Sequence, residues 1–151
     1  MDEPPERVFV ALPAQPGLAR HMIDHYTLYV RHYETSKAFY LAALRPLGYE
    51  FVMEFSRDQV PGLGAEKTCG LGVAGKPDLW IAPHPSITQV HVAFRAIGRG
   101  IVDAFHRAAL EAGGKDNGKP GLRPHYHANY YGDFVLDPDG YNVEAVCHDV
   151  G

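Results

Sequence analysis

Two histidines and one glutamate stand out because they occupy related places in a repeated pattern. His25 lies in the segment Ile-Asp-His-Tyr-Thr-Leu-Tyr-Val, and His91 lies in Gln-Val-His-Val-Ala-Phe-Arg-Ala; a helix-like run follows each. Glu144 closes the segment Asp-Pro-Asp-Gly-Tyr-Asn-Val-Glu near the end of the chain. Two imidazoles and one carboxylate are typical protein ligands of an open divalent-metal site. The sequence therefore predicts metal chemistry at these residues.

The residues around both histidines alternate in a way that predicts strands. Residues 23–31 and 88–97 alternate between two rows of side chains with a period of two. In each segment the histidine lies in the row opposite the more apolar one, so it is expected on the face that the core does not cover. Glu144 falls in the second strand of a predicted hairpin, residues 130–136 and 141–148, whose turn is Asp-Pro-Asp-Gly.

The same order of elements occurs twice, and the two histidines are 66 residues apart. The first unit, about residues 22–83, and the second, about residues 87–148, each predict a strand, a helix and three further strands. The remaining predicted elements are a helix near 34–47, strands near 49–55, 67–73 and 78–82, a helix near 101–112, a short strand near 115–117 and a polar loop at 118–129. We expect an α+β fold in which two βαβββ units form a curved mixed sheet around a concave metal site, with the helices on the outer face.

Length and composition predict a single domain, residues 22–151, preceded by an N-terminal tail or strap at residues 1–21. The net charge of −4 and the lack of a basic cluster argue against nucleic acid as a partner. No apolar run approaches the roughly 20 residues that a membrane-spanning helix needs. The acidic N-terminus does not resemble a signal peptide, and two cysteines do not form a disulfide framework, so we expect a cytoplasmic protein.

Four segments in this order resemble the vicinal oxygen chelate superfamily, which includes glyoxalase I, bleomycin-resistance and fosfomycin-resistance proteins and extradiol dioxygenases. The resemblance covers about residues 22–148. The segments are Ile-Asp-His25, Ala38-Phe-Tyr40, Val-His91-Val and Leu-Asp-Pro-Asp-Gly-Tyr-Asn-Val-Glu144. In the fosfomycin-resistance and dioxygenase branches these positions bind the metal. The resemblance therefore implies that His25, His91 and Glu144 are ligands of Fe, Mn, Zn, Ni or Co.

The resemblance implies a metal-dependent enzyme that acts on a small-molecule substrate through two adjacent oxygens, with the metal as a Lewis acid or an O₂ site. Dioxygenase, lyase or isomerase, and group-transferase reactions of the resistance-protein kind all remain open, and a homodimer is expected. The alternative is a protein that sequesters a small molecule, such as an antibiotic, without chemistry. Glyoxalase I has a fourth protein ligand. Its formal counterpart here is Asp78, which follows His25 by 53 residues as Glu144 follows His91, although Trp80 could occupy that place instead.

A second polar cluster, Arg-Pro-His-Tyr-His-Ala-Asn-Tyr at residues 123–130, contains candidate catalytic side chains. His125, His127 and Tyr130 are candidates for acid–base catalysis, and the two histidines could instead belong to a second metal site or to an exposed loop. We expect four further residues to contact the substrate: Trp80, Arg95, Gly132 and Phe134. Arg95 could hold an anionic group or form an outward salt bridge, and Gly132 would leave room for a ligand. Whether the row of Gly132 faces the metal is left open by the sequence.

Two positions have simpler expectations. His106 lies beside the apolar stripe of its helix and is predicted to be a surface residue. Cys147 has the opposite parity to Glu144 on its strand, so we expect it behind the sheet.

Overall fold

The computed structural model describes residues 23–150, and the predicted tail at 1–21 lies outside this part of the chain. The first unit contains β1 (Tyr26–Val30), α1 (Tyr33–Ala43), the short 3₁₀ helix η1 (Arg45–Leu47), β2 (Glu50–Ser56), β3 (Lys67–Val73) and β4 (Lys76–Pro83). The second contains β5 (His91–Arg95), α2 (Arg99–Glu111), β6 (Lys115–Leu122), β7 (Tyr131–Leu136) and β8 (Asn142–Cys147). The predicted order of elements is confirmed in both units.

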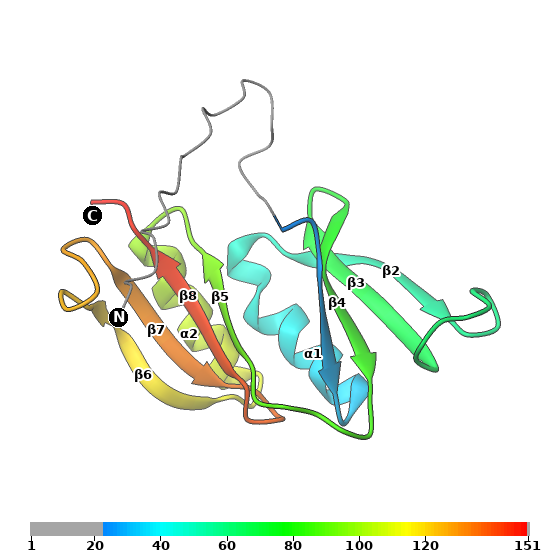
Figure 1. The fold of residues 1–151 in the computed structure, drawn as a ribbon. Helices are drawn as coiled ribbons and strands as arrows, with labels where there is room; N and C mark the ends of the chain where they lie inside the picture. The colour runs from blue at the N-terminus through cyan, green and yellow to red at the C-terminus, as the bar shows by residue number, and fades with distance from the viewer. Residues whose placement is uncertain (1–22, 151) are drawn as a thin grey trace, which may run out of the picture.

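The strands form two separate four-stranded sheets, with the orders β1-β4-β3-β2 and β5-β8-β7-β6 (Figure 1). In each sheet the first strand of the unit runs parallel to the last, and the other pairs are antiparallel. The paired βαβββ fold is therefore confirmed. The curved mixed sheet is built from two four-stranded halves, because in the described residues β1 pairs with β4 alone and β5 with β8 alone.

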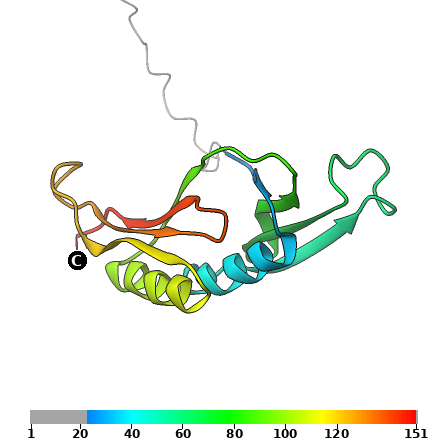
Figure 2. The same cartoon turned by 90° about the horizontal axis from the view of Figure 1, so that it is seen from below.

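The two units meet through their helices and a shared core. Figure 2 shows α2 and α1 in a row along one side of the molecule, with both sheets on the other side. The core takes one residue row from each sheet, including Leu28, Ile81 and Val143, and packs it against Phe39 of α1 and Phe105 of α2. Each such buried side chain contributes about 1.5–3 kcal/mol. We call the opposite, helix-free faces the first open face (β1–β4) and the second open face (β5–β8). Neither helix in this part of the chain is long and apolar enough to span a membrane.

The turn between β7 and β8 fixes the strand that carries Glu144. The Asp137 carboxylate accepts backbone N–H bonds from Asp139 at 2.9 Å and Tyr141 at 2.8 Å, and Gly140 has a φ of 85°. The hydroxyl of Tyr40 on α1 donates to the same carboxylate at 2.7 Å. The Asp-Pro-Asp-Gly turn is thus tied to the helix of the other unit, which locks the two halves together.

Strand β6 is longer than predicted, because it continues through residues that the sequence assigned to a loop. Its pairing with β7 shifts register on both sides of Gly118, up to Gly121. Glycine and proline are typical of loops, and here they belong to an irregular strand instead.

Candidate functional site

His91 and Glu144 lie side by side on the second open face. The parallel pairing of β5 and β8 places Ala93 opposite Glu144 and His91 opposite Asn142. The Nε2 atom of His91 is 3.2 Å from Oε2 of Glu144. Its Nδ1 atom is 3.0 Å from the backbone oxygen of Asn142, which can only accept a hydrogen bond. Nδ1 is therefore protonated, and in the neutral imidazole Nε2 presents a lone pair toward the carboxylate. A proton or a cation between them makes this arrangement favourable.

Tyr130 and Gly132 determine where the Glu144 carboxylate lies. Glu144 is 1% exposed, and the Tyr130 hydroxyl donates to its Oε1 atom. A side chain at Gly132 would place its Cβ 2.9 Å from that Oε1 and 3.1 Å from Cε1 of Tyr130, so this position requires glycine. The row containing Gly132 therefore faces the side chain of Glu144. Burial and the hydrogen bond to Glu144 raise the pKa of Tyr130, so its hydroxyl is a donor at neutral pH.

His25 lies on the first open face, in a cavity of about 290 Å³. Trp80 also lines this cavity and stacks on Phe55 with ring centroids 6.1 Å apart and an interplanar angle of 16°. The remaining lining residues are Thr27, Tyr29, Leu63, Gly64, Ala65, Thr68 and Ala82. This hollow is mainly apolar, and one imidazole reaches into it. The sequence indicated Trp80 for this hollow but not Phe55, although the alternation of residues along β2 was a signal for its face.

The two predicted histidine ligands share one hydrogen-bonding arrangement. The Nδ1 atom of His25 is 2.9 Å from Oδ1 of Asp24, and Asp24 is held in turn by Lys76 at 3.0 Å. An oxygen acceptor at Nδ1 leaves Nε2 free, as in most metal-binding histidines. Yet residues 23–150 contain no group of three His, Cys, Asp or Glu side chains that could hold a metal ion. The expected convergence of His25 with His91 and Glu144 thus does not occur within one chain.

The polar loop after β6 reaches the second open face through its histidine and tyrosine rings. His127 accepts the backbone N–H of Asn129 at Nδ1, 3.2 Å away, and its Nε2 is 2.8 Å from Nδ1 of His148. His127 therefore carries its proton on Nε2 and donates it to His148, a residue to which the sequence gave no role. Both rings pack on Tyr130, at centroid distances of 5.4 and 5.2 Å. The pair thus supports the tyrosine that holds Glu144.

The other predicted residues are divided between the open faces and the surface. Phe134 lies next to His91, with ring centroids 6.1 Å apart. His125 is exposed and its ring is tilted against that of Tyr126, with centroids 4.2 Å apart, and Arg95 is exposed. Asp78 lies next to Tyr49, whose pKa is raised by burial and by the hydrogen bond to Asp78, and it joins no metal-binding group in the described residues.

A buried contact between a histidine and a carboxylate lies behind the second sheet, and it corrects one prediction. His106 is 7% exposed, and its Nδ1 is 2.9 Å from Oδ2 of Asp133. The other oxygen of Asp133 accepts the N–H of Ala145 at 2.9 Å. The prediction that His106 is a surface residue is wrong, because α2 packs it against a carboxylate that the sequence gave no reason to pair with it. Cys147 is buried, as expected.

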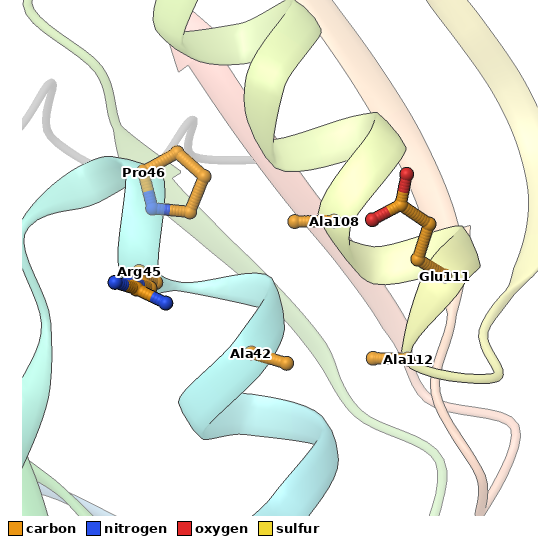
Figure 3. A pocket seen from close by; sticks show the side chains of 6 residues that line it. All are labelled: Ala42, Arg45, Pro46, Ala108, Glu111 and Ala112. Carbon is orange, nitrogen blue, oxygen red and sulfur yellow. The ribbon is translucent and has the colours of Figure 1, made fainter.

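Another cavity lies away from both open faces, between η1, the end of α1, and α2 (Figure 3). It measures about 580 Å³ and is lined by Ala42, Arg45, Pro46, Ala108, Glu111 and Ala112. Arg45 and Glu111 flank it from opposite elements. Its small side chains offer little to orient a substrate, so the candidate site remains on the open faces.

Comparisons with known proteins agree with this architecture. The family model described as Glyoxalase/Bleomycin resistance protein/Dioxygenase superfamily matches residues 22–145. A glyoxalase/bleomycin resistance protein from Albidiferax ferrireducens T118 is 24% identical, with a TM-score of 0.65 over 85% of this chain and 100% of that one. A putative glyoxalase from Bacillus halodurans is 26% identical, with a TM-score of 0.59 over 85% and 96%.

A longer relative also matches. For a glyoxalase I mutant from Zea mays the identity is 25% and the TM-score 0.61, over 82% of this chain but 46% of that one. This chain therefore spans about half of the maize chain's length. No curated protein sequence matches the chain.

Proposed function

The chain belongs to the glyoxalase/bleomycin resistance protein/dioxygenase superfamily, and on this premise we propose that it is a metal-dependent enzyme that acts on a small molecule through two adjacent oxygens. The observation that carries the proposal is the arrangement at His91. Its Nδ1 is fixed on a backbone carbonyl, and its Nε2 faces the buried Glu144 carboxylate at 3.2 Å. An imidazole lone pair and a carboxylate oxygen directed at one point suit a divalent cation.

We further propose that His25 of a second copy completes the ligand set in a homodimer. Within one chain His25 lies on the other open face, yet it shares with His91 an oxygen partner at Nδ1, which leaves Nε2 as the ring nitrogen that can bind a metal. The edges of β1 and β5 have no partner strand in the described residues, so both open faces can meet another chain there. The maize relative, about twice as long, is consistent with a site that needs two such lengths of chain.

The bound cation would act as a Lewis acid on the two substrate oxygens or as a site for O₂. The residues of the chain do the remaining work. Tyr130 donates to Glu144 and keeps its carboxylate facing His91. The His127–His148 pair packs against Tyr130 and limits its movement. Trp80 and Phe55 offer a stacked aromatic surface for the apolar body of a substrate.

Metal analysis of the purified protein tests this proposal. We expect one divalent ion per chain after loading, and we expect His91→Ala to lose it while the protein stays folded. His32→Ala is the matched control, because His32 is exposed at the start of α1. Elemental analysis and circular dichroism of the three proteins give the answer. Wild-type protein that takes up none of Fe, Mn, Zn, Ni or Co would refute the proposal.

A sequestering protein without chemistry is the second candidate, and the apolar cavity next to Trp80 is the observation that favours it. Such a protein would bind its ligand equally well after His91→Ala. An enzyme of the kind proposed would lose productive binding together with the metal. Ligand binding to metal-free protein therefore separates the two functions.

A further inference from the structure

Arg123 directly follows β6, and two carbonyl groups of β6 fix its guanidinium on the second open face. Its Nη2 donates to the carbonyl of Lys119 at 2.7 Å, and its Nη1 makes a longer contact of 3.5 Å with the carbonyl of Leu122. The backbone N–H of Arg123 donates to the backbone carbonyl of Tyr130 at 2.7 Å, which anchors the residue next to the start of β7. A half-exposed arginine normally samples many rotamers, so this fixed position costs conformational entropy.

Two glycines make room for this guanidinium. A Cβ at Gly121 would lie 3.1 Å from Nη1, and one at Gly118 would lie 3.6 Å from Nη2 and 2.9 Å from Cδ2 of Phe134. The register shifts of β6 occur at these same residues. Glycine within an irregular strand is typical of a place where another group approaches the backbone closely. Here that group is the Arg123 side chain.

The fixed charge has no carboxylate partner among residues 23–150. Its neighbours are two carbonyl oxygens and the ring of Phe134, 5.7 Å from the guanidinium carbon. On its other side Phe134 is next to His91. The positive charge therefore lies one aromatic ring away from the His91–Glu144 pair. Its influence reaches Tyr130, where it opposes part of the rise in pKa.

We propose that Arg123 binds a carboxylate of the substrate, next to the two adjacent oxygens that the metal holds. One fixed guanidinium balances one negative charge, and its planar fork matches the two oxygens of a carboxylate. This inference rests on the proposed function and narrows it to substrates that carry a carboxylate. A role confined to holding β6 in place is the competing explanation.

A pair of matched probes tests the inference by calorimetry on metal-loaded protein. One probe is a catechol that carries a carboxylate, and the other is the same catechol with a hydroxymethyl group in its place. A charge-assisted hydrogen bond predicts about 10- to 100-fold tighter binding of the carboxylate by the wild type. We expect Arg123→Met to abolish this preference, and Arg123→Lys to retain part of it. Gly121→Ala should reduce it by displacing the guanidinium, whereas Arg107→Met, on the exposed surface of α2, should leave it unchanged.

The outcomes separate this inference from the proposed function. The inference is overturned if Arg123→Met still prefers the carboxylate probe. It is also overturned if the wild type shows no such preference, including the case in which neither probe binds. A lower melting temperature of Arg123→Met with the preference intact would assign the residue to holding β6 alone. Metal content is read independently. Normal metal binding without any carboxylate preference overturns this inference alone, whereas a wild type that binds no metal overturns the proposed function.

Discussion

The two open faces come from the same succession of elements, yet they have different chemistry. The first has a mainly apolar hollow with the stacked Trp80 and Phe55 and one imidazole. The second carries the buried Glu144, its partners His91 and Tyr130, and the fixed charge of Arg123. We propose from this difference that the first unit accommodates the body of a ligand and the second supplies charge. Neither face holds a complete metal site by itself.

Removing the Glu144 charge should have the largest effect on the second face. We expect Glu144→Gln to weaken metal binding by about 100-fold or more, since changes to residues that only support a ligand already cost 10- to 100-fold. Its stability should stay equal or rise, because a buried charge is removed. Glu54→Gln is the matched control in the first unit, where Glu54 accepts from Tyr33 at 2.6 Å. Metal titration with thermal unfolding distinguishes the two, and similar metal affinity in both variants would contradict the account.

A methyl group at Gly132 should disturb the same carboxylate indirectly. Its Cβ would lie 2.9 Å from Glu144 Oε1, so we expect Gly132→Ala to cost about 1–3 kcal/mol of stability and to weaken metal binding about 10-fold. Gly64 lines the first hollow with nothing within 4 Å of its would-be Cβ, so Gly64→Ala should change stability by less than about 0.5 kcal/mol. Denaturant unfolding measures both. Equal effects of the two substitutions would remove the proposed contrast between the faces.

Substitutions on the first open face should change ligand binding and leave metal binding unchanged. We expect Trp80→Leu to weaken binding of a neutral catechol by roughly 5- to 30-fold through lost apolar contact, with unchanged metal content. Phe51→Leu, outside the lining of the hollow, is the control. Trp80 is the single tryptophan of the chain, so its fluorescence also reports ligand entry directly. A loss of metal in Trp80→Leu would show that the two roles are not separate.

The smallest effect concerns the acid behind the second sheet. Burial raises the pKa of Asp133 from 3.8 to about 6. In the first unit, the residues Cys69 and Leu71 of β3 are buried in the core cluster and carry no carboxylate. A carboxyl with a raised pKa binds its proton more tightly when folded, so its contribution to stability is lost as pH rises from about 4 to 6. Asp133→Asn should therefore gain stability relative to wild type over this range. Parallel stability curves from denaturant unfolding would contradict the assignment.

The sequence predicted the repeated units and the parity of the key residues because both depend on local patterns. Alternation placed His91 and Glu144 on one face, and the Asp-Pro-Asp-Gly turn located the final hairpin correctly. The separation into two sheets was not predictable in this way, since strand-edge pairing depends on how the units pack. The pairing of His106 with Asp133 was missed for a related reason, because contacts between residues 27 apart follow from helix-on-sheet packing.

The role of Arg123 also lay beyond the sequence patterns. Glycine and proline in residues 118–121 predicted a loop, whereas the chain uses them in an irregular strand that holds a guanidinium. The grouping of His25 with the other two ligands remains a prediction. Alternation gave its face correctly, but no local pattern indicates whether two faces of one chain or of two chains come together.

Mixing two defective variants tests the central proposal, a metal site shared between copies, most directly. His25→Ala and Glu144→Gln chains should each bind little metal alone. After unfolding and refolding together, random pairing makes half of the dimers mixed, and each mixed dimer regains one intact site, so we predict recovery of about a quarter of the wild-type metal content. A mixture that binds no more metal than the two variants measured separately would contradict the account.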